Sequence, residues 1–500
     1  MLSLFTPDLW GRLRDLLVYQ PNAPLIFNTG LFLFLFAGVS LLYYLLRRKT
    51  TARLLFLTLF SYYFYYKSSG VYVVLLALVT LTDYFIARGI ARSRQRTHSA
   101  ALPKLLLTLS ILIDLGLLVY FKYTNFFLSL WGSVVGSPVR PLDIFLPIGI
   151  SFFTFRSISY TVDVYKGKLP PITNLLDYSF FVSFFPVLLA GPIVRATDFA
   201  RQIRTPLRIT PTMTAQGVYM ILVGLLKKAV ISDYISLNFV DRVFDNPALY
   251  SGMENLIGLY GYTLQIYCDF SGYSDMAIGI ALLLGFRCKD NFNAPFRSTS
   301  VTEFWHRWHI SLSTWIRDYL YIPLGGNRKG NGYLNQLVSM LLCGLWHGAG
   351  LNFVVWGGLH GLALVGHKVL RSRLLRHPKH YRPHGIKKFF SVLLTFHFVA
   401  VMFVLFRQPE WGNVIAMFRQ IFLSFHPELL TQVLAAYYPV LALILIGYLT
   451  HFVPERSRTR TVLLLKRGGI PAQVLLSVLV IYIVIQVKSS EISPFIYFQF

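Results

Sequence analysis

The strongest constraint on the fold is a series of long apolar stretches separated by short polar segments. Hydrophobic residues make up 55% of the 500-residue sequence and charged residues only 14%, which is unlike the composition of soluble domains. Many windows reach the roughly 20 apolar residues that a helix needs to cross a bilayer. Backbone polar groups in lipid need internal partners, so continuous apolar stretches of this length are expected to be helices. The sequence therefore predicts an all-α polytopic membrane protein with roughly 11–13 transmembrane or re-entrant helices.

The excess of basic residues is explained by the membrane. The chain has 47 Lys and Arg against 21 Asp and Glu, a formal net charge of +26, and the basic residues cluster between apolar stretches. Cytoplasmic loops next to anionic membrane lipid carry such clusters, so we expect no nucleic-acid partner. If the clusters at 47–49 and 88–104 are both cytoplasmic, the spans expected at 54–66 and 71–86 form a hairpin between them. This orientation places the N-terminus outside the cytoplasm.

The sequence is interpreted as one integral-membrane domain over residues 1–500. Residues 1–23 resemble a short amphipathic segment at the membrane interface. Residues 145–366 carry the sequence motifs, 367–388 form a basic loop expected to be solvated, and 389–500 supply the C-terminal helices. The three cysteines lack metal-ligand spacing, and the histidines of the basic loop are irregularly spaced, so we predict no metal site.

Residues 301–361 hold the densest group of motifs. Ser300-Val301-Thr302-Glu303 has the spacing of a capping box, which predicts the start of a helix. Aromatic and apolar residues then recur at three- and four-residue steps and predict one aromatic face, with a stop near Pro323. The residues of this face are Trp305, Trp308, Leu312, Trp315 and Tyr319, and His309 lies on or beside it.

His347 differs from the other histidines in its depth. It follows residues 334–346, which contain no charged side chain. An ionisable residue at membrane depth is costly, which makes it a candidate functional residue.

Two further segments place polar residues inside apolar sequence. Pro186 and Pro192 predict a broken segment around residues 184–195, which membrane proteins tolerate only where protein or a water-filled cavity satisfies the backbone. Asp269 and Asp275 flank two hydroxyl residues, Ser271 and Tyr273. The carboxylates are consistent with a catalytic pair, but a structural or substrate-positioning role at a polar kink is the favoured interpretation.

Several motifs in order resemble the membrane-bound O-acyltransferase family, in its bacterial alginate O-acetyltransferase branch. They are Phe304-Trp305 through Leu312, Arg317-Asp318-Tyr319-Leu320-Tyr321-Ile322-Pro323-Leu324-Gly325-Gly326-Asn327-Arg328, Leu345-Trp346-His347-Gly348 and Trp356-Gly357-Gly358-Leu359-His360-Gly361. The polar loop Asn291-Phe292-Asn293-Ala294-Pro295-Phe296 also matches.

The resemblance implies a function and two catalytic histidines. It implies that His347 is catalytic and that His309 is the second candidate. It also implies an inner-membrane enzyme with a central tunnel and no bound cofactor. The enzyme would take acetyl groups from cytoplasmic acetyl-CoA and pass them outward. The acceptor would be a hydroxyl of an exported polysaccharide such as alginate, cellulose or peptidoglycan, reached with the help of a periplasmic acetyltransferase partner.

The chemistry of acyl transfer is compatible with these histidines. A base must take the hydroxyl proton, donors must stabilise the oxyanion, and bulk water must be kept out. His347 suits the first role because imidazole titrates near neutral pH. No Gly-x-Ser-x-Gly motif is present, so we expect direct attack by the hydroxyl, with a covalent relay as the alternative. His309 could orient the acyl carbonyl, act as a second base or hydrogen-bond in the core.

Other residues are candidates for binding the donor or substrate. The glycine turn at 325–330 could hold phosphates through its backbone N–H groups, or it could be a plain cytoplasmic turn. The candidates are Trp305, Arg317, Asp318, Arg328, Lys329, Trp346, Asn352, His360, Asp269, Ser271, Tyr273 and Asp275.

Three other functions are compatible with the sequence. D-alanyl transfer to teichoic acid is a related activity. A transporter or flippase would also need broken helices and buried polar groups, but would not depend on a deep histidine. A structural subunit of a secretion complex would tolerate His347→Ala.

Overall fold

The computed structural model describes residues 11, 14–21, 23–96, 100–375, 381, 383–487 and 495. Every regular element in these ranges is a helix and none is a strand, which confirms the predicted all-α fold. Most of the predicted interfacial segment 1–23 lies outside the described residues, as do His377 and His380 of the predicted basic loop.

Within the described ranges, six helical segments are long and apolar enough to cross a membrane. They are Thr50–Arg96, Ala101–Val135, Leu351–Ser372, Gly385–Arg407, Pro427–Phe452 and Gly469–Val487. Two shorter apolar segments, Gly30–Leu45 and Leu175–Val187, accompany them. A multi-pass membrane protein is therefore confirmed, while the larger number of spans expected from the sequence stays a prediction.

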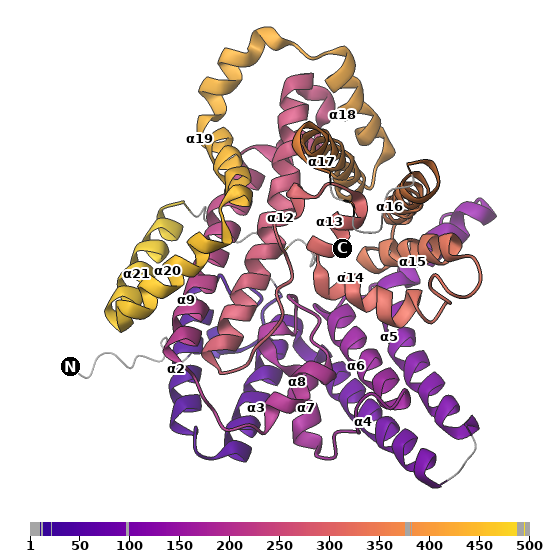
Figure 1. Ribbon diagram of the computed structural model, residues 1–500, viewed down its shortest axis with the longest axis vertical. Helices are drawn as coiled ribbons and strands as arrows, with labels where there is room; N and C mark the ends of the chain where they lie inside the picture. Colours follow the sequence, from indigo (N-terminus) through magenta and orange to yellow (C-terminus); the bar gives the residue numbers. More distant parts are fainter. Residues whose placement is uncertain are drawn as a thin grey trace. The chain divides into compact units, whose positions relative to one another are not determined.

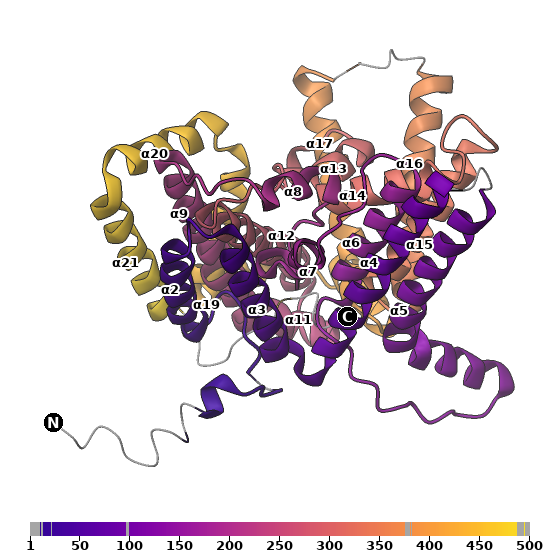
Figure 2. The same cartoon turned by 90° about the horizontal axis from the view of Figure 1, so that it is seen from below.

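The first of two compact units comprises residues 1–210 and 280–288. Its helices are α2 (Gly30–Leu45), α3 (Thr50–Ser69), α4 (Val73–Arg96), α5 (Ala101–Val135), α6 (Ile150–Tyr165), α7 (Leu175–Ser183) and α8 (Ala196–Ile203). Helices α4, α5 and α6 pack side by side (Figures 1 and 2). Between α7 and α8 the chain forms only the short helix η2 (Phe185–Val187), so the break expected from Pro186 and Pro192 is present.

The second unit comprises residues 211–279 and 289–500 and contains both candidate catalytic histidines. Its helices before residue 350 are α9 (Pro211–Leu225), α10 (Asp233–Ile235), α11 (Asp241–Asp245), α12 (Gly252–Leu283), α13 (Val301–Arg307), α14 (Ile310–Ile316) and α15 (Gly332–His347). Those after it are α16 (Leu351–Val369), α17 (Gly385–Arg407), α18 (Trp411–Leu423), α19 (Leu430–Leu449), α20 (Glu455–Arg467) and α21 (Gly469–Val487). Short π-helical turns occur at η3 (Leu226–Ser232), η4 (Ser236–Val240), η7 (Arg317–Tyr321) and η8 (Leu370–Leu374).

Helices α15 and α16 form a tight antiparallel pair, connected by the short loop 348–350. Their closest approach is between Gly344 and Gly357. A Cβ atom on Gly344 would overlap the carbonyl oxygen of Phe353, and one on Gly357 would overlap that of Met340. The backbones can approach this closely only because neither glycine has a side chain. This packing fixes the helix end that carries His347.

The predicted helix from Val301 towards Pro323 is interrupted, which corrects the sequence-based expectation. Ser300 does cap its start, since the hydroxyl accepts the N–H of Glu303 at 3.2 Å. However, α13 ends at Arg307 and α14 begins at Ile310, with His309 between them in the left-handed region at φ 42°. The aromatic spacing continues across the break, so sequence periodicity alone did not reveal it.

Candidate active site

His347 ends α15 inside a cage of aromatic rings. The side chain is buried, and its ring centroid lies 5.0 Å from that of Trp346, 5.0 Å from that of Trp356 and 5.2 Å from that of Phe406. Trp356 comes from α16 and Phe406 from the end of α17. Asn352 helps to place Phe406, because its side-chain amide donates to the carbonyl of Leu405 at 3.2 Å. The cage therefore depends on three helices.

His309 is buried completely at the break between α13 and α14. Its ring is perpendicular to that of Phe270 on α12, with the centroids 4.5 Å apart. The Nδ1 atom lies 3.3 Å from Oδ1 of Asn291. Burial lowers the pKa of His309 to about 3, so the imidazole is neutral at physiological pH.

One indole brings the two candidate histidines together. The ring centroid of Trp346 is 6.0 Å from that of His309 and 5.0 Å from that of His347. The two histidines are 38 positions apart in the sequence, and the chain folds so that both imidazoles contact the same side chain. Two residues predicted separately from motifs belong to one buried cluster.

His360 extends this cluster along α16. Its Nδ1 accepts the indole N–H of Trp305 at 3.3 Å, and its ring lies 4.6 Å from that of Trp356. An indole nitrogen can only donate, so the proton of neutral His360 resides on Nε2. Within the described part of the chain, that buried Nε2 has no hydrogen-bond partner.

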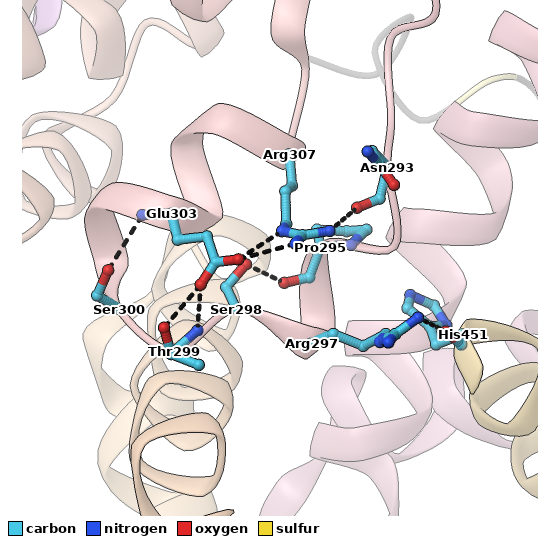
Figure 3. A network of polar contacts seen from close by, with 9 residues as sticks. All are labelled: Asn293, Pro295, Arg297, Ser298, Thr299, Ser300, Glu303, Arg307 and His451. Carbon is cyan, nitrogen blue, oxygen red and sulfur yellow. Dashed lines mark hydrogen bonds and ion pairs between the residues drawn. The ribbon is translucent and has the colours of Figure 1, made fainter. Parts of the chain in front are cut away.

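A polar network holds α13 and the loop before it (Figure 3). The carboxylate of Glu303 accepts the backbone and hydroxyl donors of Thr299 at 2.8 and 2.7 Å and pairs with Arg307 at 2.8 Å. Arg307 also donates to the carbonyl of Asn293 at 3.1 Å. Burial raises the pKa of Glu303, but the bonds from Thr299 and Arg307 outweigh it and lower the pKa below its ordinary value. Arg297 donates to the carbonyl of His451 at 3.3 Å. The network fixes residues 293–300, which follow Asn291 in the loop before α13.

A cavity of about 540 Å³ opens beside the histidine cluster. Its apolar wall includes Trp305, Met340 and Cys343, and its polar wall includes the cationic residues Arg317, Lys368 and Arg371. The remaining lining residues are Thr302, His306, Ile310, Ser313, Thr314, Ile316, Tyr321, Asn327, Gln336, Ser339, Leu364, His367 and Ser372. Trp305 is shared with the cluster, because its indole N–H bonds His360. The cavity therefore joins a basic surface to the edge of the buried site.

The residues around this cavity correct one expectation and refine another. The predicted solvated loop 367–388 begins in helical structure, since α16 continues to Val369 and η8 follows it. His367, Lys368 and Arg371 line the cavity, because helical spacing places them on one face. Arg328 and Lys329 lie exposed on the neighbouring turn and are not among the lining residues. Asp318 pairs with Arg317 at 2.7 Å.

The two carboxylates among the candidates on α12 belong to an ionic cluster. Lys228 contacts Asp269 at 2.6 Å and Asp233 at 2.7 Å, and Lys227 contacts Asp275 at 2.7 Å. Helix α12 is continuous through these positions, so the expected polar kink is wrong and the carboxylates pair with lysines. Ser271 and Tyr273 are buried on the same helix.

Comparisons with known proteins identify the family. The model of the membrane-bound O-acyltransferase family matches residues 59–406, a range that includes His309, His347 and His360. The chain belongs to the membrane-bound O-acyltransferase family. It is therefore a membrane enzyme that transfers acyl groups to hydroxyls, as its motifs predicted.

Three relatives of the chain are named for different acyl transfers. The chain is 37% identical to the probable alginate O-acetylase AlgI of Pseudomonas putida, over 86% of this chain and 90% of that protein. It is 36% identical to the peptidoglycan O-acetyltransferase of Helicobacter pylori, over 70% of this chain and 69% of that protein. It is 25% identical to the teichoic acid D-alanyltransferase of Bacillus subtilis, over 67% of this chain and 85% of that protein.

Sequence reasoning missed several residues of the site. Asn291 was assigned to a matching polar loop without a role, although its side chain contacts His309. Phe406, Lys368 and Arg371 were not candidates. The motif around Asn291 was a usable signal, whereas the other three depend on helix packing that the sequence does not specify.

Proposed function

We propose that this enzyme takes acetyl groups from cytoplasmic acetyl-CoA for the O-acetylation of an exported polysaccharide, with His347 as the general base of the first transfer to a hydroxyl. The observation that carries the proposal is the buried cluster in which His309 and His347 contact Trp346, next to a cavity with a basic wall. The relatives named for alginate and peptidoglycan O-acetylation support acetyl as the acyl group and a bacterial polysaccharide as the acceptor.

The proposed chemistry is a direct transfer from thioester to ester. The acceptor oxygen attacks the thioester carbonyl carbon while the imidazole of His347 takes the hydroxyl proton. The carbon–sulfur bond then breaks, and the coenzyme A thiolate leaves and takes up the proton. The aromatic cage of Trp346, Trp356 and Phe406 keeps bulk water away from the base, which limits hydrolysis of the donor.

The cavity is the proposed donor site. Its three cationic residues, Arg317, Lys368 and Arg371, suit the phosphates of coenzyme A, because guanidinium and ammonium groups bind phosphate through charge-assisted hydrogen bonds. Its apolar wall at Trp305, Met340 and Cys343 suits the acyl end. A donor bound this way directs its thioester towards the histidine cluster.

The proposed setting is the bacterial inner membrane. The basic clusters on the N-terminal part of the chain favour a periplasmic N-terminus, and the direction of transfer is then from the cytoplasm outward. We further propose that a periplasmic acetyltransferase partner completes delivery to the polysaccharide. Alginate and peptidoglycan are the acceptors to test first, because two relatives are named for them.

The experiment uses purified protein in vesicles with acetyl-labelled acetyl-CoA and a soluble hydroxyl acceptor. Wild type should transfer or release label, and His347→Ala should lose at least about 100-fold of this rate. His426→Ala, at an exposed histidine that pairs with Glu428, is the matched control and should behave as wild type. A folded His347→Ala protein with full turnover would contradict the catalytic assignment.

The donor site has its own test. Lys368→Ala combined with Arg371→Ala should raise KM for acetyl-CoA about tenfold with little change in kcat, as expected for lost phosphate binding. Arg328→Ala, an equally basic residue outside the cavity lining, should leave KM within about twofold. If the double variant and Arg328→Ala raised KM for acetyl-CoA equally, the donor would instead be attracted by the overall positive charge of this surface.

A further inference from the structure

Asn291 makes an unusual set of contacts at the break between α13 and α14. Its Oδ1 atom lies 3.1 Å from the backbone nitrogen of Ser311, 2.9 Å from the Ser311 hydroxyl and 3.3 Å from Nδ1 of His309. Its Nδ2 atom lies 3.2 Å from the hydroxyl of Ser274 on α12. The side chain is buried. All polar atoms of this amide are therefore engaged in the protein interior.

These contacts determine which way the amide points. A backbone N–H can only donate, so the atom facing Ser311 must be the amide oxygen. The same oxygen faces Nδ1 of His309 at 3.3 Å. The Ser311 hydroxyl also lies 3.5 Å from Nδ1, but its proton is given to Asn291 at 2.9 Å, so Nδ1 donates to the amide oxygen as well. A neutral imidazole carries one proton, and that proton is on Nδ1. The lone pair of His309 consequently resides on Nε2.

The backbone around His309 depends on the same residue. The carbonyl of Asn291 accepts the N–H of Ile310 at 2.9 Å, and Asn293 donates to the carbonyl of Arg307 at 2.9 Å. The loop thus binds the chain on both sides of His309, whose left-handed φ of 42° is costly for a residue with a side chain. Asn291 therefore holds both the backbone and the ring of His309.

The assignment separates two chemical roles for His309. To orient an acyl carbonyl or stabilise an oxyanion, a neutral imidazole needs an N–H directed at the substrate. The single N–H of His309 is already given to Asn291. What remains is Nε2, which can accept a proton but cannot donate one until it has been protonated.

We propose that Asn291 is a positioning residue that fixes the tautomer of His309 so that Nε2 serves as a hydrogen-bond acceptor, and not as a donor, during acyl transfer. This inference rests on the proposed function, because it assigns His309 a role in the same reaction. His360 has the opposite arrangement, since its Nδ1 accepts from Trp305 and its proton is on Nε2. The two buried histidines therefore differ in chemistry although both lie in the same cluster.

The first test compares variants in the acetyl-transfer assay. Asn291→Leu, which keeps the size but removes the acceptor, should lower kcat about 100-fold with KM for acetyl-CoA within about threefold. Asn291→Asp keeps an oxygen for Ser311 and for Nδ1–H of His309 and should restore at least a tenth of wild-type kcat. Ser274→Ala removes only the contact on the other side of the amide and should stay within about threefold.

The outcomes distinguish this inference from the proposed function. Full kcat in folded Asn291→Leu, together with an inactive His309→Ala, would overturn the inference and leave the proposed function intact. Full activity in His309→Ala would contradict a catalytic role for His309 itself. An Asn291→Asp protein that is folded but as inactive as Asn291→Leu would show that the acceptor oxygen is not what matters.

A second measurement needs no variant of Asn291. Nitrogen-15 NMR of histidine-labelled wild-type protein in lipid, with His309→Gln to assign the signal, reports which ring nitrogen carries the proton. The expected result is protonated Nδ1 and unprotonated Nε2 for His309. The opposite tautomer would overturn the inference whatever the stability of the variants.

Discussion

The second unit contains two polar clusters, which accommodate polar side chains in the protein interior by different means. In the ionic cluster of α12 and η3, Lys228 reaches Asp269 and Asp233 and Lys227 reaches Asp275, all at 2.6–2.7 Å. In the histidine cluster, His309, His347 and His360 are surrounded mainly by aromatic rings. In the first cluster, lysines and carboxylates form ion pairs. In the second cluster, imidazole rings pack against aromatic rings.

The difference indicates which buried polar groups are available for chemistry. A charge matched by an opposite charge at hydrogen-bond distance stabilises the packing of helices, and removing one partner leaves the other buried and unpaired. A neutral imidazole among aromatic rings can still accept or donate a proton during a reaction. We therefore expect the ionic cluster to govern stability and the histidine cluster to govern activity.

The largest expected effect is on activity. His347→Gln should lower kcat about 1,000-fold, equivalent to about 4 kcal/mol of transition-state stabilisation, since a general base contributes 10²–10⁴ in rate. The midpoint of thermal unfolding in detergent should stay close to that of wild type. If His347→Gln were much less stable than wild type while its folded fraction stayed fully active, the histidine cluster would govern stability and not activity.

The next effect is on stability. Lys228→Met should destabilise the protein by about 3 kcal/mol, because it leaves the buried carboxylate of Asp269 and the partly buried carboxylate of Asp233 without their cation. Thermal unfolding followed by fluorescence measures this, with Lys329→Met on the exposed turn as the control. Activity per folded molecule should be nearly unchanged. A stable but inactive Lys228→Met protein would indicate that this cluster is part of the active site.

A smaller effect concerns pH and His309. The pKa of about 3 in the folded protein is below the ordinary value near 6.5, so below pH 6.5 the unfolded chain binds a proton that the folded chain does not. Stability from this residue is therefore present above pH 6.5 and is lost as pH falls, by up to about 1.4 kcal/mol per pH unit. Unfolding midpoints of wild type and His309→Gln between pH 7 and 5 should show a shallower pH dependence for the variant. Parallel curves would contradict the burial of a neutral His309.

The smallest effect distinguishes histidines within the cluster. His360→Phe keeps the aromatic packing against Trp356 and loses only the bond from Trp305, whose net value is about 1 kcal/mol. We expect kcat to fall by less than about fivefold. A loss as large as that of His347→Gln would make His360 a third catalytic candidate.

The sequence was sufficient for the class of fold. Its motifs also indicated histidines that the structure brings into one cluster, while their catalytic role stays a prediction. Long apolar stretches predicted helices, Ser300 predicted a cap, and the motifs around His309 and His347 predicted the two histidines of the cluster. These features are local, so a short window of sequence contains the information. The apolar stretches also predicted a multi-pass membrane protein.

The arrangement of the site depends on contacts between distant segments. The break at His309 requires the side chain of Asn291, which is 18 residues away, and the aromatic spacing of α13 and α14 conceals it. The pairing of Asp269 with Lys228 depends on how α12 packs against η3. The cationic cavity wall was missed because Lys368 and Arg371 were assigned to a solvated charge run, when they extend the helical face of α16.

The glycine contact between α15 and α16 also has a mechanical consequence. At Gly344 and Gly357 the two helix backbones are so close that a Cβ atom would overlap a carbonyl oxygen of the other helix. A shift of one helix along the other by a single residue would therefore drive a side chain into a carbonyl. The close packing therefore ties together the two helices that carry His347 and His360.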